Sequence, residues 1–292
     1  MVMKKIFAIF FAASLAVFSL AAQDTEKQYL PKEGNWSVGF DVKPMLQLVE
    51  SILSEQSDDI ATDFNGLGGE PTLLNGPTVS IMGKYMLTDN FALKANVGIL
   101  VDNNKVAGYV TDDEASVLNP LADAKVADYK NTRSTGISLM AGAEYRIGKK
   151  RVQGVFGGGI LVGIEKAVST YHYGNAMTVI NQTPSVYNKL GKVYNENNYR
   201  TLKQFGNNPN YLFGLVGTAG VEFFVAPMVA LGAEVSLLAS YTVYQQTYII
   251  SEGYNTSTRQ IEQRTDLVTP MYGSFKLATE NLGANLYMSF YF

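Results

Sequence analysis

The closing segment of the chain alternates strictly between two kinds of side chain. Within residues 281–292, the even positions are Leu, Ala, Leu, Met, Phe and Phe, and the odd positions are Asn, Gly, Asn, Tyr, Ser and Tyr. A period of two places one face of an extended strand against an apolar environment and the other against a polar one. This closing segment is therefore expected to be a β-strand with one apolar face and one polar face.

Seven earlier segments repeat the pattern, and the connections between the eight segments alternate in length. The connections after the second, fourth and sixth segments are about three residues long, whereas the others are long for ordinary loops. Long and short connections on opposite sides are typical of a closed barrel in an outer membrane, where one side faces a periplasm. The other expected strands are 36–45, 78–87, 91–101, 134–147, 152–165, 211–225 and 229–244.

The start of the chain reads as an export signal. Lys4 and Lys5 precede a fifteen-residue apolar run, and small residues follow it, so cleavage after Ala21 or Ala22 is expected. The sequence thus divides into a signal peptide (1–22), a polar periplasmic leader (23–34) and a barrel (35–292).

Composition narrows the possible functions. The chain has no cysteine, which excludes a disulfide framework, cysteine zinc sites and thiol catalysis. The formal charge is −3, and removing the two lysines of the signal gives −3 − 2 = −5. A mildly acidic chain argues against nucleic acid as a partner.

Aromatic residues gather at two levels of the expected strands. Aromatic rings favour the lipid–water interface, because the ring body is apolar while its edge or hydroxyl tolerates water. Tyr211, Phe213 and Tyr241 mark the long-loop end. The short-turn end carries more, namely Trp36, Tyr85, Phe91, Tyr145, Phe223, Phe290 and Phe292.

Taken together, the signal, the eight segments, the alternating connections and the terminal aromatic resemble the OmpA/OmpX-type small outer-membrane barrels of Gram-negative bacteria. The resemblance implies an all-β fold, an eight-stranded antiparallel up-and-down transmembrane β-barrel with long extracellular loops and short periplasmic turns. It implies location in the cell outer membrane, in contact with membrane lipid and lipopolysaccharide. Phe292 resembles the signal that the barrel-assembly machinery reads. Unlike OmpA, the chain shows no peptidoglycan-binding domain after the barrel, so an anchoring role is not expected.

The inward positions of the expected strands carry charges of both signs in equal number. Eight strands enclose a space that side chains can fill, and desolvated charges are tolerable there only when paired. We therefore predict a salt-bridge network that plugs the lumen, with carboxylates separating Lys84 from Lys94. The alternative is a narrow channel or porin-like transporter for small hydrophobic or ionic solutes. The network residues are Asp41, Lys43, Lys84, Lys94, Glu144, Arg146, Glu222 and Glu234.

The long connections offer candidate contact surfaces. The first, around residues 46–53, fits a short amphipathic helix. The third, about 169–209, is rich in asparagine and tyrosine, which form adaptable hydrogen-bonding contacts with a protein or glycan partner. An exposed loop with no dedicated ligand explains the same composition. The tyrosines that lead the list of contact candidates are Tyr171, Tyr173, Tyr187, Tyr194 and Tyr199.

Catalytic chemistry has little support in the sequence. His172 is the one histidine, and Ser169 and Glu165 nearby allow a Ser-His-acid arrangement to be drawn, but nothing supplies an oxyanion hole. The segment from Asp102 to Asp113 fails the calcium-loop pattern because its sixth position is Ala107 where glycine is needed. We therefore predict no catalytic, cofactor-binding or metal residues, no cofactor, and a structural or surface-interaction role rather than an enzyme.

Overall fold

The computed structural model describes residues 29–41, 79–119, 121, 123–148 and 150–292. This part of the chain is all-β, as the alternation predicted, and its strands pair antiparallel in one sheet of eleven. The expected signal peptide and the amphipathic segment at 46–53 lie outside the described residues. The strands are β1 (Trp36–Asp41), β2 (Val79–Thr88), β3 (Phe91–Thr111), β4 (Lys125–Ile147), β5 (Val152–His172), β6 (Arg200–Gly206), β7 (Asn210–Ala226), β8 (Val229–Tyr244), β9 (Thr247–Asn255), β10 (Gln260–Thr269) and β11 (Tyr272–Tyr291).

Eight of these strands close into a ring. Each strand pairs with the next in the order β1, β2, β3, β4, β5, β7, β8 and β11, and β11 returns to pair with β1. The first and last strands are hydrogen-bonded neighbours, with Ser37 opposite Tyr291 and Phe40 opposite Met288. Closure satisfies the backbone groups that an open sheet would leave at its edges.

Side chains of the ring strands alternate between an exposed outer face and a buried inner face. In β11, Leu286 is exposed, as is Phe292 directly after the strand, whereas Tyr287, Ser289 and Tyr291 are buried inside the ring. Among the described side chains, the outer face of each ring strand exposes aliphatic and aromatic groups. We call this band of exposed apolar side chains around the ring the apolar belt. One row of this belt comprises Phe91, Tyr145 and Phe156, and a row nearer the long connections comprises Ile99, Ile137, Ile164 and Tyr211.

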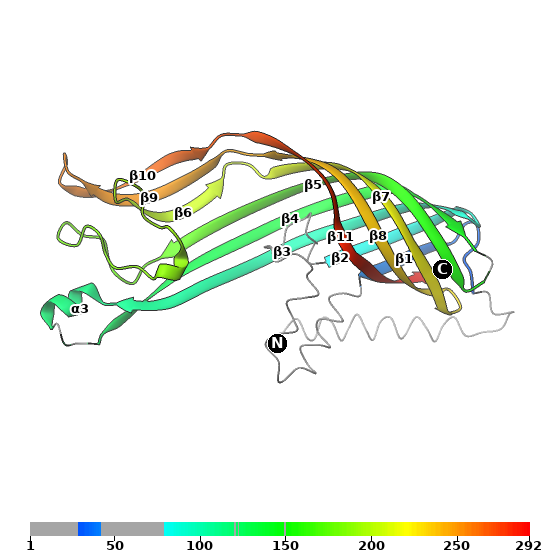
Figure 1. Ribbon diagram of the computed structural model, residues 1–292, viewed down its shortest axis with the longest axis horizontal. Helices are drawn as coiled ribbons and strands as arrows, with labels where there is room; N and C mark the ends of the chain where they lie inside the picture. The colour runs from blue at the N-terminus through cyan, green and yellow to red at the C-terminus, as the bar shows by residue number, and fades with distance from the viewer. Residues whose placement is uncertain (1–28, 42–78, 120, 122, 149) are drawn as a thin grey trace.

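The sheet continues far beyond the ring, which the sequence did not predict. Residues 102–132 and 169–209 were expected to be loops, but β3 and β4 pair without a break from Phe91–Tyr145 to Thr111–Lys125. β6 joins the outer end of β5, β9 joins β6, and β10 joins β9. These strands form one long curved sheet that projects from the ring (Figure 1). The loop prediction was wrong because backbone pairing can continue where the apolar alternation stops.

Helical structure is minor in the described part. A short helix, α3 (Asp113–Leu118), follows β3 at the far tip of the sheet, and a 3₁₀ turn, η1 (Asn188–Leu190), lies between β5 and β6. Asp112 caps α3 by accepting a hydrogen bond from the backbone N–H of Ala115. None of the helices in the ranges described above is long and apolar enough to cross a membrane.

The short turns gather at the opposite end of the molecule, together with the described part of the leader (Figure 1). Residues 29–35 pack there rather than trailing free. Tyr29 and Leu30 contact an apolar cluster inside the ring, and the backbone N–H of Gly34 donates to the Met86 carbonyl at 2.9 Å. The leader thus lies across this mouth of the ring.

Candidate functional site

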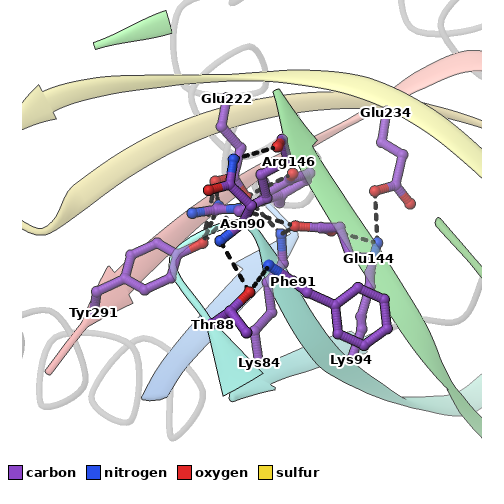
Figure 2. Close-up of polar contacts among 11 residues, drawn as sticks. Lys84, Thr88, Asn90, Phe91, Lys94, Glu144, Arg146, Glu222, Glu234 and Tyr291 are labelled. Carbon is purple, nitrogen blue, oxygen red and sulfur yellow. Dashed lines mark hydrogen bonds and ion pairs between the residues drawn. The ribbon is translucent and has the colours of Figure 1, made fainter. Parts of the chain in front are cut away.

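The interior of the ring holds a connected network of six charged side chains (Figure 2). All six are at most 7% exposed, and they come from five different strands. Three are cationic and three are anionic, so the network is electrically balanced. Its members are Lys84, Lys94, Glu144, Arg146, Glu222 and Glu234.

Glu144 lies between the two lysines, as predicted. Lys84 and Lys94 are directly opposite each other on β2 and β3, where two like charges would repel. Glu144 Oε1 is 2.7 Å from Lys84 Nζ, and its Oε2 is 3.6 Å from Lys94 Nζ. The carboxylate therefore compensates both ammonium groups.

Glu222 is the most heavily bonded member of the network. Lys84 Nζ donates to its Oε1 at 2.6 Å, and the guanidinium of Arg146 donates to its Oε2. The hydroxyls of Tyr287 and Tyr291 also donate to this carboxylate, at 2.9 Å and 3.1 Å. Charge-assisted hydrogen bonds of this kind offset the desolvation of a buried carboxylate.

Glu234 completes the network on the far side. Its Oε2 is 2.5 Å from Lys94 Nζ. Glu222 and Glu234 lie on the adjacent strands β7 and β8, so each needs a cation nearby. The structure supplies different cations to each, with Lys94 on Glu234 and Lys84 with Arg146 on Glu222.

Apolar layers lie on both sides of the charged network. Toward the short turns, Tyr29, Leu30 and Met228 pack on a cluster of Met86, Ala92, Phe224, Ala230 and Tyr291. Toward the long connections, Leu161 packs on Leu100 and Leu212. The described interior side chains therefore form three successive layers, two apolar and one charged, and eight strands enclose a space that side chains can fill.

The side chains of two predicted network members lie outside the described part of the chain. Asp41 belongs to β1, but its side chain is outside the described part, and so is the whole of Lys43. Sequence reasoning missed Tyr287 and Tyr291 as network members. The signal was present, because both occupy odd positions of the closing segment, on the same face as Ser289.

Phe292 lies at the short-turn end, where the first and last strands meet. Its aromatic side chain stacks on the indole of Trp36 with 4.6 Å between centroids, and its backbone N–H donates to the Trp36 carbonyl at 2.8 Å. The terminal aromatic thus joins the first and last strands. Whether it is also read during assembly stays a prediction.

Four of the five candidate tyrosines of the third long connection pack together in one cluster. Tyr171 is buried with Leu190 and Val193, and Tyr173, Tyr187 and Tyr194 pack around this cluster. Tyr199 lies under the guanidinium of Arg264, at 4.0 Å from its ring centroid. These residues form a small core within the projecting sheet, which leaves little of their surface for a partner.

Arg200 anchors this outer core, and sequence reasoning did not single it out. It is 3% exposed, and its Nε donates to Glu252 at 2.6 Å while Nη1 donates to the Asn175 carbonyl at 2.9 Å. Its guanidinium also lies over the ring of Tyr173, with 4.3 Å to the centroid. Burial raises the pKa of the Tyr173 hydroxyl, although Arg200 opposes that shift.

Asp113 connects the far tip of the sheet to the segment before η1. Its Oδ2 accepts hydrogen bonds from Asn181 Nδ2 at 2.7 Å and from the backbone N–H of Ser185 at 2.8 Å. Partial burial alone would raise the pKa of Asp113, but these bonds and the charge of Arg200 outweigh it and lower the pKa below its ordinary value. The carboxylate is thus stabilised in its charged form.

The weak catalytic arrangement is not assembled. His172 ends β5, and its ring stacks on Tyr129 with 4.4 Å between centroids. Ser169, three residues earlier on the same strand, points to the opposite face and shares a 3.0 Å hydrogen bond with Thr132.

The segment that failed the calcium pattern, Asp102 to Asp113, runs along the outer part of β3 and ends at the first residue of α3. Nowhere in the described residues do three or more acidic, histidine or cysteine side chains come together in a way that could hold a metal ion.

Comparison with known proteins returns no relative. No protein-family model matches the chain, and no curated protein matches it significantly. The clues to function therefore lie in the fold and in the side chains inside the ring.

Proposed function

We propose that the chain is an outer-membrane β-barrel of the kind the sequence resembles, with a closed lumen, and that it holds a long β-sheet outside the membrane for contact with other surface molecules. The observation that carries this proposal is the apolar belt. Soluble proteins rarely expose contiguous apolar surface on this scale, whereas a ring with an apolar outer face and a polar, filled interior suits lipid.

The height of the belt supports the membrane placement. Along β4 the exposed apolar side chains run from Ile137 to Ile147, and along β3 they run from Phe91 to Val101. A tilted strand of about 9–11 residues crosses a bilayer. Beyond these positions the strands turn polar, starting with Asp102 on β3 and Arg133 on β4.

The projecting sheet supports the second half of the proposal. β4 has 23 residues, about twice what a crossing needs. Its outer end, with β3, β5, β6, β9 and β10, therefore stands clear of the lipid. The far tip exposes Val117, Leu118, Leu121 and Ile180, and exposed apolar groups of this kind are typical of contact surfaces. The tip therefore replaces the five tyrosines as the candidate for a protein or glycan contact.

The side chains packed inside the ring favour a closed lumen over the alternative function, a narrow channel or transporter. Reconstituted into planar bilayers, the purified protein is expected to give no steady single-channel conductance. A large, stable conductance would contradict the closed lumen and favour transport.

A photo-crosslinker at Leu118, in intact cells, tests the contact role of the tip. We expect it to give one defined adduct, and the same crosslinker at Asn104, which is exposed in the projecting part of β3, to give none. Identical adduct patterns from both positions would contradict a dedicated contact at the tip.

A further inference from the structure

A cavity of about 840 Å³ opens at the short-turn mouth of the ring, between the leader and the turns that follow β2 and β4. Its walls include four cationic side chains, Lys32, Arg146, Lys150 and Arg151, and one carboxylate, Asp89. This concentration of positive charge stands out in a chain whose formal net charge is negative. The size is within the range of cavities that hold small molecules.

Three of the four cations have no carboxylate partner in the part of the chain that the structure describes. Within the described ranges, Lys32, Lys150 and Arg151 form no ion pair, whereas Arg146 is held by the network beneath. The carboxylate of Asp89 is also engaged, because its Oδ1 accepts the backbone N–H of Glu33 at 2.9 Å. The cavity therefore presents positive charge that no carboxylate among the described residues neutralises.

Local contacts hold the backbone of the segments that carry the exposed cationic side chains. The guanidinium of Arg151 lies 3.9 Å from the centroid of the Tyr29 ring. The Lys150 carbonyl accepts a 2.7 Å hydrogen bond from Gln153 Nε2, and the backbone N–H of Lys32 donates to Asn35 Oδ1 at 2.7 Å. A frame built before binding reduces the entropy lost on capturing a ligand.

From this geometry we infer that the cavity is a binding site for a phosphate-bearing ligand. A guanidinium offers a planar fork to phosphate oxygens, and ammonium groups add compact charge beside it. Apolar lining from Leu30, Pro31 and Val152 suits the carbon part of such a ligand. Phosphate can come from the headgroup of an anionic lipid in the adjacent leaflet or from a soluble phosphate compound.

The lipid source rests on the proposed membrane placement, since the Trp36–Phe292 stack would put this mouth near the headgroups. The soluble source does not depend on it. The two proposals can therefore fail separately.

Calorimetry on the full mature protein, in a phosphate-free detergent, tests the inference. The probes are dihexanoyl phosphatidylglycerol, inorganic phosphate, and dihexanoylglycerol, which lacks phosphate. Binding of the phosphatidylglycerol alone assigns the site to a lipid headgroup, and binding of inorganic phosphate as well assigns it to soluble phosphates. Failure of both phosphate probes, or equal binding of dihexanoylglycerol, overturns the inference.

Paired variants connect any binding to this cavity. The double variant Lys150→Gln/Arg151→Gln is expected to weaken binding by roughly tenfold or more, because charge-assisted hydrogen bonds are lost. The control Lys189→Gln/Lys192→Gln removes two exposed cations near η1 and should leave binding unchanged. Unchanged binding in the first variant, or an equal loss in the control, would mean that the cavity is not the site.

Discussion

At the scale of single residues, the interior of the ring depends on matched charges. Glu222 is fully buried and compensates Lys84 and Arg146 at once, while two tyrosine hydroxyls complete its hydrogen bonds. Removing one member of a buried network leaves its partners without compensation, which costs more than the net value of the pair. Single substitutions in this network are therefore expected to lower the free energy of unfolding more than substitutions of exposed residues.

Glu222→Ala is expected to lower the free energy of unfolding by about 3–5 kcal/mol, because two buried cations lose their carboxylate. Urea unfolding of the protein in lipid vesicles measures this. The control is Glu196→Ala, at an exposed position, which should change stability by no more than about 0.5 kcal/mol. Similar small effects from both variants would mean that the network does not stabilise the ring.

At the scale of strands, close approaches between neighbours depend on missing side chains. Gly232 on β8 lies directly opposite Tyr287 on β11, and a Cβ at Gly232 would come within 2.1 Å of the tyrosine ring. The same ring carries the hydroxyl that donates to Glu222. A glycine on one strand thus makes room for a network member on the next.

Gly232→Ala is therefore expected to destabilise the protein by about 1–3 kcal/mol, the usual cost of overpacking. Gly217→Ala is the matched control, since nothing lies within 4 Å of its added methyl group, and it should be neutral or slightly stabilising. The cost of Gly232→Ala should largely disappear in a Tyr287→Ala background, as residues in contact are energetically coupled. Additive effects of the two substitutions would show that the steric explanation is wrong.

At the scale of the whole molecule, one continuous sheet carries two kinds of surface. Around the ring its outer face is apolar, whereas the same strands carry mixed polar and apolar residues where they leave it, starting with Asp102 on β3 and Arg133 on β4. Hydrogen bonding continues unchanged across this boundary, with Val101 opposite Thr135 and Asp102 opposite Ser134. The change in side chains rather than any change in backbone marks where lipid would end.

Because the chain has no cysteine, single-cysteine probes can map this boundary. In lipid vesicles, a fluorophore on Leu139→Cys, in the belt of β4, should be quenched by lipids that carry a quencher on the acyl chain. The same fluorophore on Tyr109→Cys, in the outer part of β3, should be quenched by aqueous iodide instead. Equal aqueous quenching at both positions would contradict the membrane placement.

The alternation of side chains was enough to predict the strands of the ring and most of its interior charges. A period of two is a local property that each strand carries alone, and it also separates inward from outward residues, so six of the eight predicted network residues were found together. The strand lengths and the projecting sheet were missed, because polar and apolar residues mixed on both faces leave no periodic signal even where pairing continues.

Two features could be read only from the folded chain. These are the pairing of the interior charges and the packing of the leader across the mouth of the ring. The contact of Glu222 with Lys84 joins residues 138 positions apart, and the packing of the leader on the turns is set by contacts that no local pattern records. Such contacts depend on the register and stagger of a closed ring, and one strand cannot specify these until all its neighbours are in place.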